Sequence, residues 1–151
     1  MSALVVDDDV HLRALLAELL EDEGFDVTTA SNGFSGLRLA AERRPRLVLL
    51  DVVMPEMSGA EVLRELRTSS ATRDIAVVVV TGNAQRLTAA QLADADGLVR
   101  KPFEVPELLA TVHRAVERAS ARHGAGVALA TTQPHHLTGH ARRGTARRTR
   151  R

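Results

Sequence analysis

The amino-acid sequence predicts an α/β protein with a doubly wound parallel sheet of five strands and helices on both faces. Three observations lead to this class. Short apolar runs alternate with amphipathic segments over about 121 residues, and such alternation is typical of βα units joined by right-handed crossovers. Several runs are apolar without interruption, which is typical of strands that are covered on both faces. Each such run is followed at once by polar or charged residues, where a strand must end.

The composition allows one domain of ordinary size. The chain has 151 residues, of which 44% are hydrophobic and nearly all of these aliphatic. The absence of cysteine excludes disulfides, thiolate metal sites and thiol chemistry, and is consistent with a cytoplasmic location. No apolar run approaches the roughly 20 residues of a membrane span, and no basic stretch precedes an apolar one at the N-terminus, so we expect neither a membrane span nor a signal peptide.

Charge divides the chain into two parts. Residues 1–121 hold all 19 acids and 13 of the 20 basic residues, a net charge of −6, whereas residues 122–151 hold seven arginines and no acid. The last part is also poor in large apolar side chains, so it cannot bury enough surface to offset the entropy lost on ordering. We therefore expect a folded domain over 1–122 and a disordered Arg-rich tail over 123–151.

The first half of the domain contains two predicted βα units. An apolar strand over residues 3–6 ends in three aspartates, and the helix after it stops at Gly24. That helix has apolar residues at helical spacing on its predicted inner face, namely Val10, Leu12, Leu15, Leu16, Leu19 and Leu20. Arg13, Glu18, Glu21 and Asp22 are expected on its outer side. A second strand over 25–29 alternates apolar and polar residues. The Asn32-Gly33 turn then leads into a helix that must end near Pro45.

The second half contains three more units. A strand over 47–50 ends at Asp51, and a capping box from Ser58 to Glu61 begins the third helix. The β-branched run 75–80 predicts an interior strand. A second capping box, from Thr88 to Gln91, begins a short fourth helix. A brief strand over 98–100 precedes the last helix, which has Pro106 in its first turn and is expected to fray near His123 and Gly124.

Reactive side chains stand at the ends of four predicted strands: Asp7 with Asp8, then Asp51, Thr81 and Lys101. In an open α/β sheet the carboxyl ends of the strands form the ligand site, so these side chains are expected to meet. Clustered carboxylates repel one another unless a hard cation binds them, and Mg²⁺ prefers such oxygen ligands. An aspartate can act as a nucleophile towards phosphorus. A lysine charge and a threonine hydroxyl can then stabilise a phosphoryl group, and Gly82 leaves space for it to enter.

These motifs together give the sequence a family resemblance. Residues 3 to about 121 resemble the receiver domain of bacterial two-component response regulators, which has a flavodoxin-like fold. The resemblance is carried by Val6-Asp7-Asp8-Asp9, Asp51-Val52-Val53-Met54-Pro55, Thr81-Gly82 and Lys101-Pro102-Phe103. It implies a cytoplasmic phosphorelay protein that accepts a phosphoryl group onto Asp51 from the phosphohistidine of a sensor kinase or a phosphotransfer protein.

The resemblance also implies a role for each site residue. Asp8 binds Mg²⁺ directly, Asp7 binds it mainly through water, Asp51 contributes a carboxylate oxygen, and the backbone carbonyl of Val53 completes the protein ligands. Thr81 moves towards the phosphoryl group, and Lys101 pairs with it. The role of Asp9, the third acid of the first motif, is less direct.

Two features depart from the family pattern. Leu98 stands where family members usually carry the aromatic switch partner of the threonine, so the phosphorylated state is expected to be read out more weakly or through backbone motion. The spacing from Thr81 to Lys101 is also shorter than usual, which predicts a truncated fourth helix. Neither feature touches the phosphorylation chemistry.

We expect a stand-alone receiver that signals through contacts with a downstream protein, because the tail is too short to hold a DNA-binding domain with its own core. Its only catalysis would be its own phosphorylation and slow autodephosphorylation. The alternative is a receiver-like binding module that works without phosphorylation. A Mg²⁺-dependent phosphatase would use a second acid just after Asp51, and Val52 and Val53 supply none.

Three interpretations of the basic tail stay open. Its arginine pairs can contact phosphates, but without interleaved aromatics any nucleic-acid binding would be non-specific and salt-sensitive. The tail can instead lean on the acidic domain and change access to Asp51 through charge. It can also be a solvated segment with no specific role.

Overall fold

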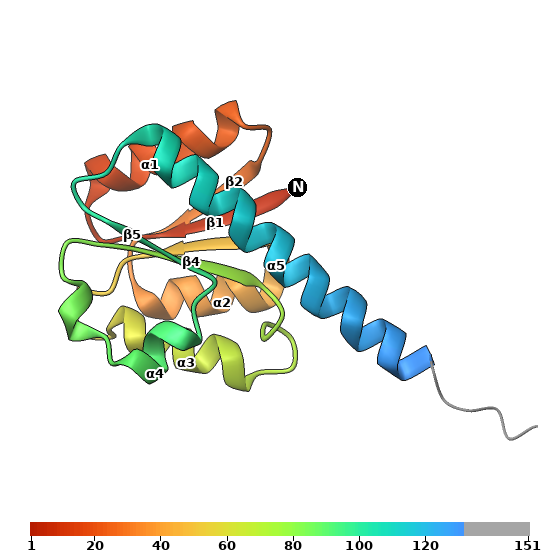
Figure 1. The fold of residues 1–151 in the computed structure, drawn as a ribbon. Helices are drawn as coiled ribbons and strands as arrows, with labels where there is room; N and C mark the ends of the chain where they lie inside the picture. Colours follow the sequence, from red (N-terminus) through yellow and green to blue (C-terminus); the bar gives the residue numbers. More distant parts are fainter. Residues whose placement is uncertain (132–151) are drawn as a thin grey trace, which may run out of the picture.

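The computed structural model describes residues 1–131, which form one parallel five-stranded sheet between two layers of helices (Figure 1). The strands lie in the order β2-β1-β3-β4-β5, and every neighbouring pair is parallel. Their bounds are β1 Ser2–Val6, β2 Asp26–Ala30, β3 Leu47–Leu50, β4 Ala76–Thr81 and β5 Gly97–Arg100. The predicted doubly wound α/β class is therefore confirmed, with each strand within a residue or so of its predicted position.

Five α-helices and one short 3₁₀ turn connect the strands. Helices α1 and α5 cover one face of the sheet, and α2, α3 and α4 cover the other (Figure 1). The bounds are α1 Val10–Asp22, α2 Gly33–Arg43, α3 Gly59–Thr68, η1 Ala84–Arg86, α4 Ala89–Ala93 and α5 Val105–Thr131. The fourth helix is only five residues long, as the spacing between Thr81 and Lys101 predicts.

Each face of the sheet has its own aliphatic core. On one face, Leu16 of α1 and Leu108 and Val112 of α5 pack on alternate residues of the strands. On the other, side chains of α2 and α3, among them Leu63 and Leu66, pack on the intervening ones. All four residues of β3 and all six of β4 are buried. Burial on both faces explains why these strands read as uninterrupted apolar runs.

Side-chain caps fix where the helices begin. Asp9 accepts hydrogen bonds from the backbone N–H groups of His11 and Leu12 at the start of α1, and Asn32 caps α2 in the same way. Both predicted capping boxes are present, from Ser58 on α3 and from Thr88 on α4. Each cap satisfies an N–H group that the helix itself leaves without a partner. The helix starts near the carboxyl ends of the strands are thereby held in place.

The inner face of α1 is narrower than the sequence predicts. Val10 and Leu15 were expected to face the core but are exposed, whereas Leu16 and Leu20 are buried. Arg13 was expected on the outer side but is only half-exposed, and its guanidinium donates to the carbonyl oxygen of Asp7. Helical periodicity assigns residues to a face, but it does not show how far the neighbouring elements cover that face.

The last helix is longer than predicted. α5 continues through His123 and Gly124, where we expected it to fray, and ends at Thr131. The residues after Gly124 include three alanines and a leucine, which have high helix propensity and offset the cost of the two glycines. α5 therefore extends beyond the end of the sheet (Figure 1). The rest of the tail predicted over 123–151 lies outside the described residues.

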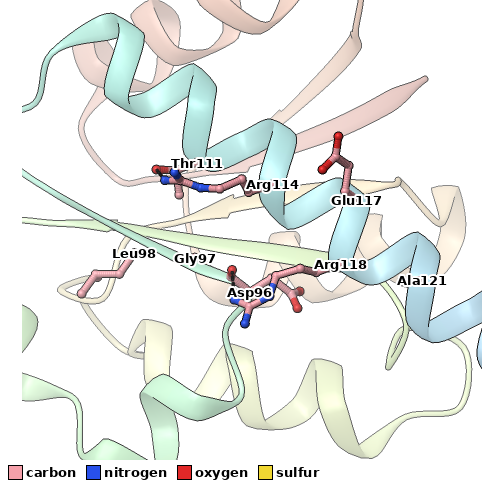
Figure 2. A pocket seen from close by; sticks show the side chains of 8 residues that line it. All are labelled: Asp96, Gly97, Leu98, Thr111, Arg114, Glu117, Arg118 and Ala121. Carbon is pink, nitrogen blue, oxygen red and sulfur yellow. Dashed lines mark hydrogen bonds between the residues drawn. The ribbon is translucent and has the colours of Figure 1, made fainter.

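α5 packs closely against the start of β5. A Cβ atom at Gly97 would lie 2.6 Å from Cγ2 of Thr111, so only glycine allows this contact without a shift. Both residues line the pocket between β5 and α5 (Figure 2). Among residues 1–131, no helix is both long enough and apolar enough to cross a membrane.

Candidate functional site

The carboxyl edge of the sheet carries the residues that the sequence singles out. Asp7 follows β1, Asp51 follows β3, Thr81 is the last residue of β4, and Lys101 follows β5. Because β1, β3, β4 and β5 are consecutive in the sheet, these ends stand side by side. The predicted meeting of these side chains at one edge is thus present in the structure.

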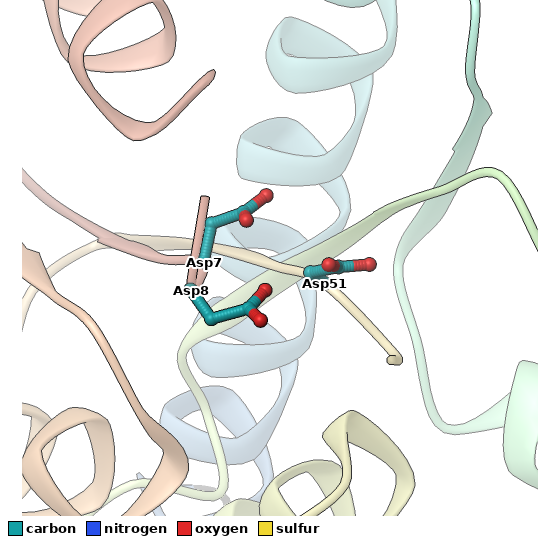
Figure 3. A group of neighbouring side chains, drawn as sticks. All are labelled: Asp7, Asp8 and Asp51. Carbon is teal, nitrogen blue, oxygen red and sulfur yellow. The ribbon is translucent and has the colours of Figure 1, made fainter. Parts of the chain in front are cut away.

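Three carboxylates form the centre of the site. Asp7, Asp8 and Asp51 each offer an oxygen, and these oxygens all lie within 4.8 Å of one another; the three side chains point into one space (Figure 3). Asp7 and Asp51 are 1% and 7% exposed, whereas Asp8 is open to solvent. The donor set is made of hard oxygens only and has one open side, which fits Mg²⁺ with retained waters.

Lys101 is the cation that faces these acids. Its ammonium nitrogen lies 3.4 Å from Oδ2 of Asp7 and 3.6 Å from Oδ2 of Asp51. Burial raises the pKa of Asp51 above its ordinary value; Lys101 opposes this, and Asp7 adds to it. One ammonium does not neutralise three carboxylates, so the site keeps a negative charge that favours a divalent cation.

The backbone holds Asp7 rigidly. Its side chain accepts from the N–H of Asp9 at 2.9 Å, and its own N–H donates to Ala30 of β2 at 3.1 Å. Its carbonyl oxygen accepts from Arg13 at 2.8 Å. Arg13 was missed by the sequence reasoning, because its helical position alone suggests an outward side chain. Asp9 caps α1, which accounts for its less direct role.

The loop after β3 is fixed from both ends. Oδ1 of Asp51 accepts from the N–H of Val53 at 3.4 Å, and the N–H of Gly59 donates to Val52 at 2.8 Å. A Cβ atom at Gly59 would lie 2.1 Å from the carbonyl oxygen of Asp51. The sequence shows Gly59 only as part of a capping box, and its second role appears only once α3 is seated on the loop. That the Val53 carbonyl is a metal ligand stays a prediction.

Thr81 is buried beside the cluster, with its hydroxyl bound to the following loop. Its Oγ1 accepts from the N–H of Asn83 at 3.1 Å. The Asn83 side-chain oxygen is buried and, among the residues that the structure describes, finds no hydrogen-bond partner. A Cβ atom at Gly82 would meet only Cβ of Lys101, at 3.9 Å. The space that the sequence assigns to Gly82 is therefore present next to Lys101.

Leu98 occupies the position of the missing aromatic. It is half-buried and packs in a small cluster on β4 and its neighbouring loops, with Val52, Val79 and Leu87. Val52 adjoins Asp51, so Leu98 contacts the loop after β3 through an apolar neighbour. Whether this packing weakens the readout of the site stays a prediction.

Comparison with known proteins gives one consistent family. Residues 3–113 match the family model of the response regulator receiver domain. The receiver domain protein from Clostridium thermocellum superposes with a TM-score of 0.71 at 31% identity, over 80% of this chain and 97% of that one. This likeness bears out the flavodoxin-like receiver fold.

Comparison with curated relatives points to the same family. The chain is 43% identical over 121 residues to the transcriptional regulatory protein CpxR homolog of Haemophilus influenzae, covering 78% of this chain and 51% of the relative. It is 38% identical over 129 residues to the response regulator MprA of Mycolicibacterium vanbaalenii, covering 85% and 56%. The chain thus spans about half the length of the curated relatives it matches.

Proposed function

The chain belongs to the response regulator receiver family, and from this we propose that Asp51 accepts a phosphoryl group from a phosphohistidine on a sensor kinase or phosphotransfer protein. Receiver domains are signalling domains rather than enzymes that act on outside substrates. The observation that carries the proposal is the cluster of three carboxylates with the Lys101 ammonium 3.6 Å from Asp51. That arrangement supports the proposal because a nucleophile, a cation site and a partner for the phosphoryl oxygens would then lie close together at one edge of the sheet.

The transfer is a displacement at phosphorus. A carboxylate oxygen of Asp51 attacks the phosphorus atom, an O–P bond forms, and the P–N bond to the histidine ring breaks. The ring nitrogen keeps the electron pair and takes up a proton. Lys101 pairs with an oxygen of the transferred group, and Thr81 leaves its bond from Asn83 to donate to another. Water later attacks the phosphorus atom slowly, the O–P bond to Asp51 breaks, inorganic phosphate leaves, and Asp51 returns to the carboxylate.

Mg²⁺ is the cofactor of this proposal. Asp7, Asp8 and Asp51 would hold it, with Val53 adding a backbone oxygen. The bound ion would offset the charge of the carboxylates and of the incoming phosphoryl group. Support comes from the donor chemistry, which is all oxygen, and from the open side at Asp8.

Mass spectrometry after incubation with Mg²⁺ and acetyl phosphate, a small phosphoryl donor, tests the proposal. The full chain should gain one phosphoryl group, and chelation of Mg²⁺ should abolish the gain. The Asp51→Asn variant should stay unmodified, whereas Asp94→Asn, which changes an exposed aspartate, should react like the wild type. A phosphoryl group that persists in Asp51→Asn would refute the assignment of the acceptor.

The output that we propose is contact with another protein, whose affinity depends on phosphorylation. The CpxR homolog, which is named as a transcriptional regulatory protein, and the response regulator MprA extend over about twice the matched length, so their activities as whole proteins are not transferred to this chain. The stand-alone organisation and the cytoplasmic location stay predictions.

The alternative is a binding module that works without phosphorylation, and the packing of Leu98 in place of an aromatic is the observation that favours it. Failure of the wild type to gain a phosphoryl group would support this alternative.

A further inference from the structure

Asp96 is a buried carboxylate at the edge of the sheet opposite to the phosphoacceptor site. Its side chain is 3% exposed and accepts from the N–H of Val77 at 2.9 Å and from the guanidinium of Arg67 at 2.9 Å. Arg122 of α5 makes a second ion pair with it, and Arg118 donates to its backbone oxygen at 3.3 Å. One residue thus joins α3, β4 and α5.

The two arginines on this carboxylate differ in how firmly they are held. Arg67 is 16% exposed and also donates to the carbonyl oxygens of Arg73, Ile75 and Asp94. Arg122 is 46% exposed. If Arg122 leaves, Oδ2 of Asp96 keeps its bonds from Arg67 and Val77, so the carboxylate stays ion-paired and only Oδ1 loses its partner. Of the two ion pairs, the contact to α5 is therefore the one that opens first.

Strand β5 connects this carboxylate to the phosphoacceptor site. Asp96 directly precedes the strand and Lys101 directly follows it, and the strand between them has only four residues. Its span is about 13 Å at the rise of a parallel strand. Gly97 packs against Thr111 of α5, so a displacement of β5 would shift α5 directly (Figure 2).

We propose that the Arg122–Asp96 contact is a releasable latch through which occupation of Asp51 loosens residues 116–122 of α5. A phosphoryl group on Asp51 attracts Lys101, and Lys101 draws the end of β5. Asp96 is held to α3 and β4 on one side and to α5 on the other, and the exposed Arg122 contact yields first. This proposal rests on the proposed function, because it describes a structural change that phosphorylation of Asp51 would produce.

The latch predicts reciprocal effects, because coupling between two sites is symmetric. If occupation of Asp51 favours the open latch, then removal of the latch must favour occupation of Asp51. Both directions are open to measurement in the same protein with beryllofluoride and Mg²⁺, where beryllofluoride stands in for the phosphoryl group.

The test is amide hydrogen exchange by NMR on the full chain, for wild type, Arg122→Gln and Arg114→Gln. Arg114 is the matched control, since it is an exposed arginine of α5 that donates to Thr111 rather than to Asp96. Beryllofluoride binding is followed separately through the amide shifts of Asp51 and Thr81. This separate readout keeps failure of the latch distinct from failure of the proposed function.

In the wild type, beryllofluoride should lower the protection of residues 116–122 about tenfold or more. In Arg122→Gln, residues 116–122 should already have this low protection without beryllofluoride, and adding it should change their protection little. This variant should bind beryllofluoride about fivefold more tightly than the wild type does. Arg114→Gln should behave as the wild type.

Unchanged protection in a wild type that binds beryllofluoride would overturn the latch and leave the proposed function intact. The latch would also be overturned if Arg122→Gln binds beryllofluoride with wild-type affinity, or if Arg114→Gln reproduces the effects of Arg122→Gln. No shift at Asp51 in the wild type would overturn the proposed function, and the latch with it.

Discussion

Gly59 lies so close to the carbonyl oxygen of Asp51 that a Cβ atom at position 59 would be 2.1 Å from that oxygen. The start of α3 therefore packs directly on the loop that carries Asp51. No rotamer change relieves such a contact, because both partners are backbone or Cβ atoms, so this contact ties the shape of the site to the seating of α3.

Gly59→Ala should destabilise the protein by about 3 kcal/mol or more, since the loop after β3 and the helix must separate. Urea unfolding followed by circular dichroism measures this. Gly124→Ala is the control: nothing lies within 4 Å of a Cβ there, and the residue is inside α5, so alanine should raise stability by about 0.5–1 kcal/mol. Equal stabilities for the two variants would contradict the contact.

Asp51→Asn should stabilise the fold at neutral pH when Mg²⁺ is chelated. The pKa of Asp51 is raised in the folded chain by burial, against the opposing charge of Lys101 and with the added repulsion of Asp7. An acid with a raised folded pKa favours the fold at low pH, and this contribution is lost as the pH rises through that pKa. We expect a gain of roughly 1 kcal/mol in urea unfolding at pH 7.

The exposed Asp26→Asn is the matched control for this measurement and should leave stability unchanged. A less stable Asp51→Asn would mean that the carboxylate is not strained in the metal-free site. The size of the gain should shrink when Mg²⁺ is added, because the ion favours the wild-type carboxylate.

Lys101→Met should raise the pKa of Asp51 further, because the ammonium 3.6 Å away is the main group that lowers it. Carbon NMR of the Asp51 carboxyl during a pH titration with Mg²⁺ chelated gives that pKa directly. Arg100→Met, a change at the exposed neighbouring residue, should leave the titration of Asp51 where it is. A titration unmoved by Lys101→Met would show that the two groups do not interact.

Asp8→Asn should weaken Mg²⁺ binding at least about tenfold with little loss of stability, because Asp8 is exposed and belongs to the carboxylate cluster that we propose holds the ion. Isothermal calorimetry measures the affinity. Asp9→Asn makes a suitable control, since asparagine caps a helix as well as aspartate does and Asp9 caps α1. Equal weakening by both substitutions would point to general charge rather than to a ligand at Asp8.

Asp96→Asn should cost about 3 kcal/mol, because it leaves the buried Arg67 guanidinium without its charged partner. Burial alone would raise the pKa of Asp96, but the hydrogen bonds from Arg122 and Val77 and the charge of Arg67 outweigh it and hold the pKa below 3.8. The stability from this group is therefore present above pH 3.8 and is lost as the pH falls through the lower folded value. Urea unfolding from pH 7 to pH 2 should show the variant and the wild type converging in acid.

Most of the fold was predictable because its signals are local. The uninterrupted run 47–50 and the β-branched run 75–80 define buried strands by themselves, and the capping boxes at Ser58 and Thr88 mark the starts of their helices within a residue. The meeting of Asp7, Asp51, Thr81 and Lys101 was predicted because each residue ends a strand and the carboxyl ends of parallel strands share one edge of the sheet.

What the sequence did not show depends on contacts between distant residues. Asp96 reads as an ordinary loop acid until α3 and α5 bring Arg67 and Arg122 to it from 29 and 26 residues away. Two other contacts also form only when the elements pack together. Arg13 donates to the carbonyl oxygen of Asp7, and Gly59 lies too close to Asp51 for a side chain. The end of α5 was predicted too early because Gly124 was interpreted as a signal that ends the helix.

The length of α5 makes its far end a mechanical lever. Ala119 is the last buried residue that the structure describes on this helix, and the helix continues to Thr131, about 18 Å further at 1.5 Å per residue. By that geometry a tilt of about 10° at Ala119 displaces the end by about 3 Å. A change too small to see at the sheet is thus magnified where the helix leaves the body, and a spin label or fluorophore there would report it as a change in distance.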